Sequence, residues 1–493
     1  MVDVGQNVYM LNETNAAEMS AALQAMRSAH VAERPVSASV REDRLNRLLI
    51  LLDRYAERFI ETLDRDFGGR SRETSLMNDL LASAESIRYA KKQLRDWMRP
   101  ESRRGVIPFN LFGARVEVRP VPKGVVGILG TWNVPLFTLL SPLAFVIAAG
   151  NRALLKPSEN TPATSALLRE AINELFLRDE IEVVLGGAET SAAFSALPFD
   201  HLVLTGSDRV ARLVAAAAAT HLTPLTLELG GKSPVIIGAS ADLATATRRI
   251  LIGKIMNSGQ ICVAPDTVYV PRARLADLLA QARATFAQLQ PSGASESTAI
   301  INDTQLYRLR SMLQELAGSN VDVVTLGVTE SASARQLPLS LVIDPPETSR
   351  IAGTEIFGPI LQIRTYEKID EVIAAINARP SPLALYYFGR DTREEARILE
   401  KIRAGGVTIN DVLMHVAASD APFGGVGGSG YGCYHGREGF LQFSHALTVY
   451  RSGWWDPRRA LGLEPPYGSK TFERLRKVLR PERVVVSGVV DSR

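Results

Sequence analysis

The sequence predicts an α/β protein with at least two domains. Its 493 residues are too many for one ordinary hydrophobic core. From residue 124 onward, short apolar runs of strand length alternate with segments of helical pattern. This alternation is typical of a parallel sheet covered by helices on both faces. Residues 116–121 instead alternate apolar and polar side chains, which indicates an exposed strand.

The first hundred residues are expected to be mainly helical. Residues 1–34 have little periodicity, and we expect a mobile or loosely docked arm there. Residues 41–67 predict one amphipathic helix that ends at Gly68-Gly69. Its apolar residues recur at helical spacing, and they are Leu45, Leu48, Leu49, Leu52, Tyr55 and Phe59. Residues 74–98 repeat the pattern and end before Pro100.

The first alternating region predicts one α/β domain. Its expected strands are residues 125–129, 153–155, 182–185 and 201–204. Helical segments follow these strands at residues 135–149, 163–176 and 209–219. Thr161 and Pro162 are a favourable N-cap and first position for the second helix.

The alternation restarts after Gly230-Gly231 and predicts a second α/β domain. The expected strands are residues 235–237, 267–270, 321–326, 341–343, 360–365, 383–388 and 406–409. The expected helices between them are residues 274–290, 306–316, 369–378 and 392–403. A further strand-like stretch lies at residues 441–450. The tail that follows has no clear pattern and is interrupted by Pro465-Pro466.

Composition excludes several classes of function. The net charge of +3 is small, and acidic and basic residues are interleaved, so we expect no nucleic-acid partner. Two cysteines and no apparent secretory signal predict a cytoplasmic, reducing setting. The six histidines lack zinc-ligand spacing, so we expect no metal. Residues 124–151 contain no charge, but Pro135 and Pro142 interrupt them before membrane-spanning length, so we expect no membrane insertion.

Cys262 is the candidate nucleophile of this sequence. It lies in a polar, glycine-containing stretch, residues 257–266, between an apolar helical segment and a predicted strand. A thiol on such a loop can face a cleft. A lone cysteine is more often a small buried hydrophobe, so the assignment depends on neighbouring motifs.

Those motifs resemble the NAD(P)-dependent aldehyde dehydrogenases over about residues 41–451. The resemblance rests on Glu-Leu-Gly-Gly-Lys-Ser-Pro at 228–234, Gly-Gln-Ile-Cys-Val-Ala-Pro-Asp at 259–266, Trp-Asn-Val-Pro at 132–135, Thr-Glu-Ile-Phe-Gly-Pro-Ile-Leu at 354–361 and Pro-Phe-Gly-Gly at 422–425. It implies that Cys262 attacks the aldehyde and that Glu228 activates the hydrolytic water. It also implies that the Asn133 amide and the Cys262 backbone N–H stabilise the oxyanion. Without that context, Asn133 is read as a loop residue forming an Asx turn, and Glu228 as a strand-end carboxylate.

The same resemblance implies a cofactor site for NAD, with some use of NADP. Gly206 and Ser207 join a predicted strand to a helix, an arrangement that can bind a pyrophosphate at the helix N-terminus. Taken alone, Ser207 is equally an N-cap. Lys156 resembles the residue that contacts the adenosine ribose, and Glu159 resembles the acid that accepts from its 2′-hydroxyl. Further along the chain, resemblance places Glu355 at the nicotinamide ribose and Phe357 beside the nicotinamide, although Phe357 also suits a core.

The resemblance also implies a Rossmann-like cofactor domain, a catalytic domain and a small β-extension for homodimer formation. The corresponding boundaries are residues 1–100 and 124–228 for the NAD(P)-binding domain, 229–437 for the catalytic domain, 101–123 and 438–453 for the extension, and 454–493 for a C-terminal tail.

Residues 409–415 and 422–432 resemble the branch that oxidises aromatic and fatty aldehydes, and most closely the bacterial coniferyl aldehyde dehydrogenases. A fatty or aliphatic aldehyde dehydrogenase is the alternative. A CoA-acylating member would release the thioester to CoA, and such members usually lack an acid at the position of Glu228. A thiol hydrolase needs a histidine partner for Cys262, and the sequence nominates none. A non-catalytic binding protein would have no use for Asn133, Glu228, Cys262 and Glu355 together.

Overall fold

The structure is a computed structural model, and it describes residues 13–290, 297–327 and 335–479. The chain forms two compact units. The first comprises the residues up to Met98 together with Val121–His445, and the second comprises Arg99–Pro120 and the residues from Ala446 onward. The predicted α/β class with a small additional β-sheet is confirmed. The finer domain boundaries stated under the sequence analysis stay a prediction.

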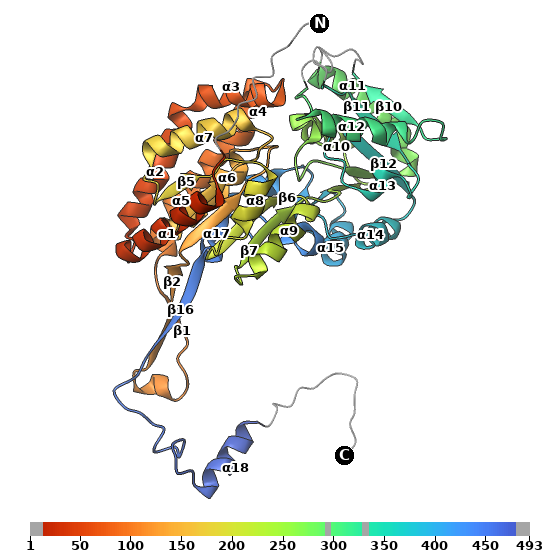
Figure 1. The fold of residues 1–493 in the computed structure, drawn as a ribbon. Helices are drawn as coiled ribbons and strands as arrows, with labels where there is room; N and C mark the ends of the chain where they lie inside the picture. The colour runs from red at the N-terminus through yellow and green to blue at the C-terminus, as the bar shows by residue number, and fades with distance from the viewer. Residues whose placement is uncertain (1–12, 291–296, 328–334, 480–493) are drawn as a thin grey trace, which may run out of the picture. The chain divides into compact units, whose positions relative to one another are not determined.

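A six-stranded sheet forms the first half of the large unit (Figure 1). Its strand order is β15-β7-β6-β3-β4-β5. The strands are β3 (Val125–Leu129), β4 (Arg152–Lys156), β5 (Ile181–Val183), β6 (His201–Gly206), β7 (Leu225–Leu229) and β15 (Gly430–Tyr431). All pairs are parallel except β15 with β7. Chain connections run from β3 towards β5 on one side and through β6 to β7 on the other, so the connections diverge between β3 and β6.

Helices cover both faces of this sheet. On one face, α6 and α7 pack against the strands, with α2, α3 and α5 around them. On the other face lie α1, α8 and α9. Their bounds are α1 (Ala16–Glu33), α2 (Ala38–Arg54), α3 (Ala56–Phe67), α5 (Ala82–Trp97), α6 (Phe137–Ala148), α7 (Pro162–Leu175), α8 (Ala188–Ser195) and α9 (Asp208–Ala219). In β3, Val126 and Ile128 enter one core while Val125 and Leu129 enter the other, which explains its continuous apolar sequence.

The expectation of a loosely docked N-terminal arm is wrong for residues 16–33. These residues form α1, whose N-terminus has a capping box between Asn15 and Glu18. Met19, Leu23 and Met26 bury one face of the helix against the sheet. Residues 1–12 of the expected arm lie outside the described residues.

The single helix predicted for residues 41–67 is two helices. α2 ends and α3 begins at Tyr55, whose backbone leaves the helical region at φ −100° and ψ 7°. The Tyr55 hydroxyl donates to Glu174 of α7, so a tertiary contact accompanies the break. Gly68 ends α3 in the left-handed conformation, as predicted. The next helical stretch runs through α4 (Arg72–Ser75), a π-helical turn η1 (Leu76–Leu81) and α5.

A seven-stranded sheet forms the second half of the large unit, with the order β10-β11-β12-β9-β8-β13-β14. Only β10 is antiparallel to its neighbour. The strands are β8 (Pro234–Ile237), β9 (Thr267–Pro271), β10 (Val323–Leu326), β11 (Leu339–Ile343), β12 (Ile360–Tyr366), β13 (Ala384–Phe388) and β14 (Gly406–Ile409). The helices of this half are α10 (Leu243–Ile255), α11 (Leu275–Leu289), α12 (Asp303–Gln314), α13 (Arg350–Gly353), α14 (Ile369–Asn377), α15 (Thr392–Lys401) and α16 (Met414–Ala417). A further helix, α17 (Gly436–Gln442), packs against α5 and α6 of the first half.

One apolar core runs through both halves of the large unit. It includes α6 and strand β3 on one side, and β8, β9 and α10 on the other. A shared core makes independent motion of the two sheets costly, because separating them would expose apolar surface. Residues placed at the junction of the sheets therefore have fixed neighbours.

Most of a three-stranded sheet lies in the second unit, and its strands are β1 (Glu101–Arg103), β2 (Arg115–Pro122) and β16 (Ser444–Arg451). β1 and β2 are antiparallel, and β16 lies on the other side of β2. The tail expected to lack pattern contains a helix, α18 (Ser469–Val478), while residues 480–493 lie outside the described residues. In the parts of the chain that the structure describes, no helix has the length and apolar character needed to span a membrane.

Candidate active site

Four predicted site residues come from neighbouring strands of the six-stranded sheet. Asn133 follows β3, Lys156 ends β4, Gly206 ends β6, and Glu228 is the penultimate residue of β7. These strands are parallel, so their carboxyl ends meet at one edge of the sheet. The chain connections diverge at this edge, between β3 and β6. In open α/β sheets such an edge forms the crevice in which ligands bind.

Cys262 reaches this edge from the loop that joins α10 to β9. After α10 the backbone turns through left-handed conformations, with φ of 48° at Asn257, 53° at Ser258 and 72° at Gly259. At Gly259 a side chain would also collide with the carbonyl oxygen of Gly358, 2.5 Å from the position of a Cβ. The local sequence therefore needs glycine at position 259 for both conformation and space.

Buried side chains hold the Cys262 loop in place. The Gln260 side-chain nitrogen donates to the carbonyls of Asn257 and Ala299, both at 3.1 Å, and its oxygen accepts from the Ile301 N–H at 3.1 Å. The Tyr386 hydroxyl donates to the carbonyl of Val263 at 2.5 Å. These bonds are fully buried, so the loop is a rigid support for the thiol.

Glu228 and Cys262 lie close together, and both have raised pKa values. The raised pKa suits Glu228 as a base, whereas it disfavours the thiolate form of Cys262. Burial raises the pKa of Glu228 to about 7, offset only in part by weak interactions with the Cys262 thiol and the Thr205 hydroxyl. A carboxylate with that pKa can accept and release protons near neutrality. Cys262 as a residue is half-buried, and burial of its thiol together with the nearby Glu228 and Glu355 carboxylates raises the pKa of the thiol. The thiol therefore needs a proton acceptor or a positive charge to become a thiolate.

Several polar atoms at this edge are buried and have no well-aligned hydrogen-bond partner among the described residues. They are Oδ1 of Asn133, Oγ1 of Thr205 and both carboxylate oxygens of Glu228. Such atoms are costly in a folded protein and are expected where a ligand or water completes the bonding. The Asx turn considered for Asn133 would require its Oδ1 as an acceptor, and that bond is not formed.

A buried ion pair supports the loop that contains Asn133. Arg70 and Asp79 pair at 2.7 Å, and both side chains have no accessible surface. The second Asp79 oxygen accepts from the backbone N–H of Leu136 at 3.0 Å, close to the start of α6. Asp79 lies in the π-helical turn η1. No local sequence pattern indicates this contact, because Asp79 and Leu136 are distant in the chain.

Glu355 packs against the glycines that follow β7. A Cβ at Gly230 would lie 2.3 Å from both Glu355 carboxylate oxygens. Burial raises the pKa of Glu355 to about 8, helped by Asp266 and opposed by a hydrogen bond from the Gly231 N–H. Phe357, two residues later, meets Trp132 edge to face, with ring centroids 5.3 Å apart. Glu355 and Phe357, which were predicted at the nicotinamide end of the site, therefore lie beside the chain segments that contain Glu228 and Asn133.

Asp266 and Lys232 connect three motifs, a role not expected from the sequence. The Lys232 ammonium donates to Asp266 at 2.5 Å and to the carbonyls of Ile351 and Thr354 at 2.8 and 2.9 Å. Asp266 also accepts from the N–H of Ile356 at 2.8 Å. These bonds fix the segment of Glu355 against the segment of Cys262. The available signal was that Lys232 and Asp266 lie within the motifs at 228–234 and 259–266.

At the far end of the same edge, Lys156 is buried, and its ammonium lies 4.0 Å from the Glu159 carboxylate. A third charged residue, Glu13, was missed. Thr14 pairs with Leu185 through its N–H at 2.9 Å, and the Glu13 carboxylate accepts from the N–H of Gly187 at 3.1 Å. There Glu13 is close enough to raise the pKa of Lys156, against the larger lowering by burial.

Ser207 is the N-cap of α9, as its alternative interpretation suggested. Its hydroxyl accepts from the N–H of Val210 at 3.4 Å. The cap does not exclude the cofactor interpretation, because Gly206 and the start of α9 still lie at the sheet edge. Acidic acceptors at Glu159 and Glu355, with a helix N-terminus between them, fit the two riboses and the pyrophosphate of a dinucleotide.

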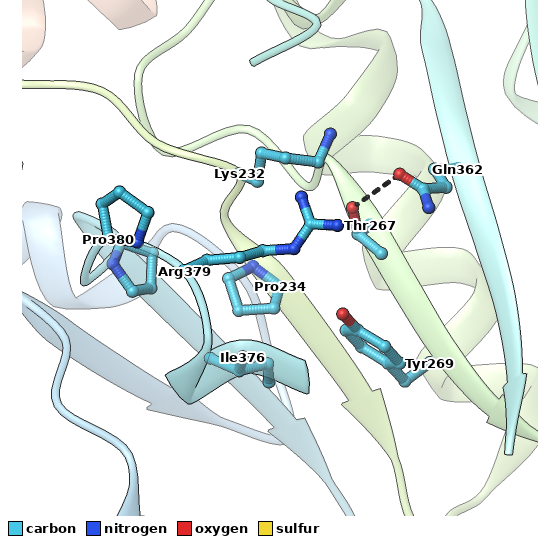
Figure 2. Close-up of a pocket in the computed structure, with 9 residues that line it drawn as sticks. Lys232, Pro234, Thr267, Tyr269, Gln362, Ile376, Arg379 and Pro380 are labelled. Atoms are coloured by element: carbon cyan, nitrogen blue, oxygen red, sulfur yellow. Dashed lines mark hydrogen bonds between the residues drawn. The ribbon is translucent and has the colours of Figure 1, made fainter. Parts of the chain in front are cut away.

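A pocket on the seven-stranded sheet is lined by none of the predicted catalytic residues. Figure 2 shows Lys232 and Arg379 beside it, with Thr267 hydrogen-bonded to Gln362 at 3.3 Å. No thiol or carboxylate is among its lining residues, which are Lys232, Pro234, Thr267, Tyr269, Gln362, Ile376, Arg379, Pro380 and Pro382. Within the described ranges, no group of three or more His, Cys, Asp or Glu side chains is arranged to hold a metal ion.

Comparison with known proteins agrees with this arrangement. The chain matches the Aldehyde dehydrogenase family over residues 4–449. It is 40% identical over 479 residues to a probable coniferyl aldehyde dehydrogenase of Caulobacter vibrioides, covering 96% of this chain and 98% of the relative. It is 41% identical over 440 residues to the coniferyl aldehyde dehydrogenase of Pseudomonas sp. strain HR199, covering 88% and 91%.

Solved structures agree as well. The substrate-bound state of Staphylococcus aureus AldH is 33% identical and superimposes with a TM-score of 0.87, covering 95% of this chain and 100% of that one. A mutant of aldehyde dehydrogenase C from Pseudomonas syringae, in complex with NAD+ and octanal, is 28% identical with a TM-score of 0.77, covering 90% of each chain. The chain therefore belongs to the aldehyde dehydrogenase family, the NAD(P)-dependent oxidoreductases that its motifs predicted.

Proposed function

We propose that the protein oxidises a hydroxycinnamaldehyde, with coniferyl aldehyde first, to the carboxylic acid, and that it prefers NAD to NADP. The observation that supports the chemistry most directly is the pairing of the Cys262 thiol with Glu228, whose pKa of about 7 suits a general base. The aromatic substrate is supported by about 40% identity to coniferyl aldehyde dehydrogenases over most of the chain.

Cys262 is the nucleophile of this proposal. Its thiolate attacks the aldehyde carbon, a C–S bond forms, and the carbonyl electron pair moves to oxygen. The resulting oxyanion needs donors placed in advance, and the Asn133 amide and the Cys262 backbone N–H supply them. Asn133 is buried, with its loop supported by Asp79, so these donors require little reorganisation.

Lys156, Glu159, Gly206, Ser207, Glu355 and Phe357 would hold the cofactor. The hydride of the Cys262-bound carbon would leave to bound NAD+, so that a thioester remains on Cys262, and the positively charged ring of the cofactor would favour the Cys262 thiolate. The buried carboxylates near Cys262 raise the pKa of its thiol in the free protein, so nucleophilic attack before cofactor binding is disfavoured.

Glu228 completes the reaction by removing a proton from water. The water oxygen attacks the thioester carbon, the C–S bond breaks, and the Cys262 thiolate leaves. A base with pKa near 7 is half ionised at neutral pH and can accept this proton. Glu228 also argues against the CoA-acylating alternative, because transfer of the acyl group to CoA needs no base for water.

A substrate panel tests the aromatic assignment. Purified protein with NAD is expected to give a higher kcat/KM for coniferyl aldehyde than for hexanal or octanal. An advantage of more than about tenfold for an aliphatic aldehyde, roughly 1.4 kcal/mol of transition-state discrimination, would favour the fatty-aldehyde alternative.

We also propose a homodimer formed through the second unit. That unit exposes large apolar side chains, including Val106, Ile107, Leu111, Leu447, Tyr450 and Trp454. Large apolar side chains that stay exposed in this number are typical of a protein interface. Light scattering after size exclusion should give twice the monomer mass, and Tyr450→Glu should shift the protein towards monomer. A monomeric wild type would exclude the dimer.

A further inference from the structure

We infer that Asn257 is a positioning residue that holds Asn133 and Cys262 in fixed relation, so that both oxyanion donors address one oxygen atom. This inference rests on the proposed roles of Asn133 and Cys262. Asn257 is not expected to touch the substrate; it acts through the two loops it connects.

One amide group joins the two loops. Nδ2 of Asn257 donates to the carbonyl oxygen of Asn133 at 3.0 Å and to the carbonyl oxygen of Gln260 at 3.2 Å. The first bond spans 124 residues of sequence, and the second lies within the loop of Cys262. Movement of either loop would lengthen one of these bonds.

The backbone of Asn257 adds a second constraint. Its carbonyl oxygen accepts from both the N–H and the side-chain nitrogen of Gln260, each at 3.1 Å. This geometry requires a left-handed backbone with φ of 48°, which asparagine tolerates better than most residues and glycine tolerates best. Substitution by glycine therefore removes the side-chain amide of Asn257 while it allows the same backbone conformation.

Burial of the Asn257 side-chain amide costs free energy, because one of its polar atoms has no hydrogen-bond partner in the described part of the chain. Asn257 is 1% exposed, and its Oδ1 has no hydrogen-bond partner among the described residues. A residue needed only for the turn would be served by glycine, which leaves no buried acceptor unsatisfied. What asparagine adds is the bridge from the Cys262 loop to Asn133.

The bridge matters because the two proposed donors come from different loops. The Asn133 amide follows β3, while the Cys262 N–H precedes β9. Stabilisation of one oxyanion requires both donors within about 3 Å of it at the same time. An independent shift of either loop by about 1 Å can cost around 10²-fold in rate.

The primary test compares Asn257→Gly with Ser258→Gly. Both positions have left-handed φ, and both side chains make buried hydrogen bonds; that of Ser258 goes to the Thr298 carbonyl at 2.5 Å and not to Asn133. Rapid-mixing absorbance at saturating NAD measures the first turnover. Asn257→Gly should slow it by about 10- to 100-fold, with KM for the aldehyde changed less. Ser258→Gly should slow it less than about threefold. Equal slowing in both variants would overturn the inference.

A double-mutant cycle shows whether Asn257 acts through Asn133. In the Asn133→Ala background, Asn257→Gly should lower the rate of the first turnover by less than about a further threefold. The reason is that the donor being positioned is already absent in that background. A full additional loss in that background would overturn the inference. Iodoacetamide alkylation of Cys262, measured in a Cys433→Ser background, should be little changed by Asn257→Gly. A matching loss of alkylation would assign the effect to the thiol instead.

Cys262→Ala separates failure of this inference from failure of the proposed function. If Cys262→Ala retains aldehyde oxidation, the proposed nucleophile is wrong and the inference fails with it. If Cys262→Ala is inactive while Asn257→Gly matches wild type, only the positioning role is wrong.

Discussion

The carboxylate of Glu355 lies directly against the α-carbon of Gly230, so that a Cβ at position 230 would be 2.3 Å from each carboxylate oxygen. The glycine after β7 therefore leaves the space that Glu355 occupies. Gly230 does not adopt a left-handed φ, so a side chain there would act mainly by displacing Glu355.

The first prediction follows from that contact. Gly230→Ala should move the Glu355 carboxylate and raise KM for NAD by about tenfold, which is the loss of one charged hydrogen bond of roughly 1.4 kcal/mol. Gly353→Ala is the matched control, because a Cβ there meets no atom within 4 Å. Initial rates at varied NAD measure both. An unchanged KM in Gly230→Ala would remove Glu355 from the cofactor site.

The second prediction concerns the two cysteines. Cys262→Ala should abolish dehydrogenation, because it removes the proposed nucleophile and leaves Cys433 as the one remaining cysteine of the sequence. Cys433→Ser should retain nearly full activity, since Cys433 lies in a glycine-rich loop to which we assign no chemistry. Aldehyde-dependent NADH formation measures both. Loss of activity in Cys433→Ser alone would reverse the assignment.

The third prediction separates hydride transfer from hydrolysis. Glu228→Gln keeps the shape but cannot accept a proton, so it should give a stoichiometric burst of reduced cofactor and a steady rate lowered by about 10²-fold or more. Intact-mass spectrometry of quenched samples should find the acyl group on Cys262. Loss of the burst would mean that Glu228 deprotonates Cys262 instead, and unchanged turnover would exclude Glu228 from the mechanism.

The same residue sets an expected pH dependence. Because burial raises the pKa of Glu228 to about 7, its basic form predominates above pH 7 and is lost below it. Where hydrolysis limits the rate, kcat should fall about tenfold per pH unit below 7, and Glu228→Gln should remove this dependence. A wild-type kcat that stays flat down to pH 5.5 would contradict the assignment.

The fourth prediction concerns cofactor preference. Glu159 and Glu13 lie around Lys156, and a 2′-phosphate there would meet like charges. Wild type should favour NAD over NADP in kcat/KM. Glu159→Gln and Glu13→Gln should each narrow the gap, while Glu18→Gln, in the capping box of α1, should leave it unchanged. A wild-type preference for NADP would contradict the proposal.

The fifth prediction concerns acid stability. Burial alone would raise the pKa of Glu180, but hydrogen bonds from Arg47 and Arg44 lower it to about 2. The carboxylate therefore stabilises the fold fully above about pH 4.5, and this contribution, up to about 3 kcal/mol, is lost as pH falls towards 2.

Urea unfolding at several pH values tests this contribution of Glu180 to stability. Glu180→Gln should lower the urea midpoint at pH 7, and the midpoint of this variant should fall less than that of wild type between pH 4.5 and 2. Glu170→Gln removes an exposed ion pair with Arg58 and should change the midpoint little, because exposed pairs contribute little. Equal effects of the two variants at pH 7 would contradict a special role for the buried network.

The alternation of strands and helices was predictable because its signal is local. Buried parallel strands need continuous apolar runs, and both cores of the six-stranded sheet use the alternate side chains of β3. α1 was missed because its buried residues, Met19, Leu23 and Met26, are diluted by alanines on its other faces. The break at Tyr55 has no glycine or proline to mark it, and its side chain is bonded to another helix.

The sequence by itself determined the chemical groups of this protein: a thiol, a carboxylate, an amide and the glycines that give them room. Tertiary structure alone decided how these groups meet. The contacts of Gly230 with Glu355, Asp79 with Leu136, and Asn257 with Asn133 each join segments far apart in the chain. Such contacts depend on how strands and loops pack around a shared core. The raised pKa of Glu228 arises in the same way, because burial is a property of the assembled fold.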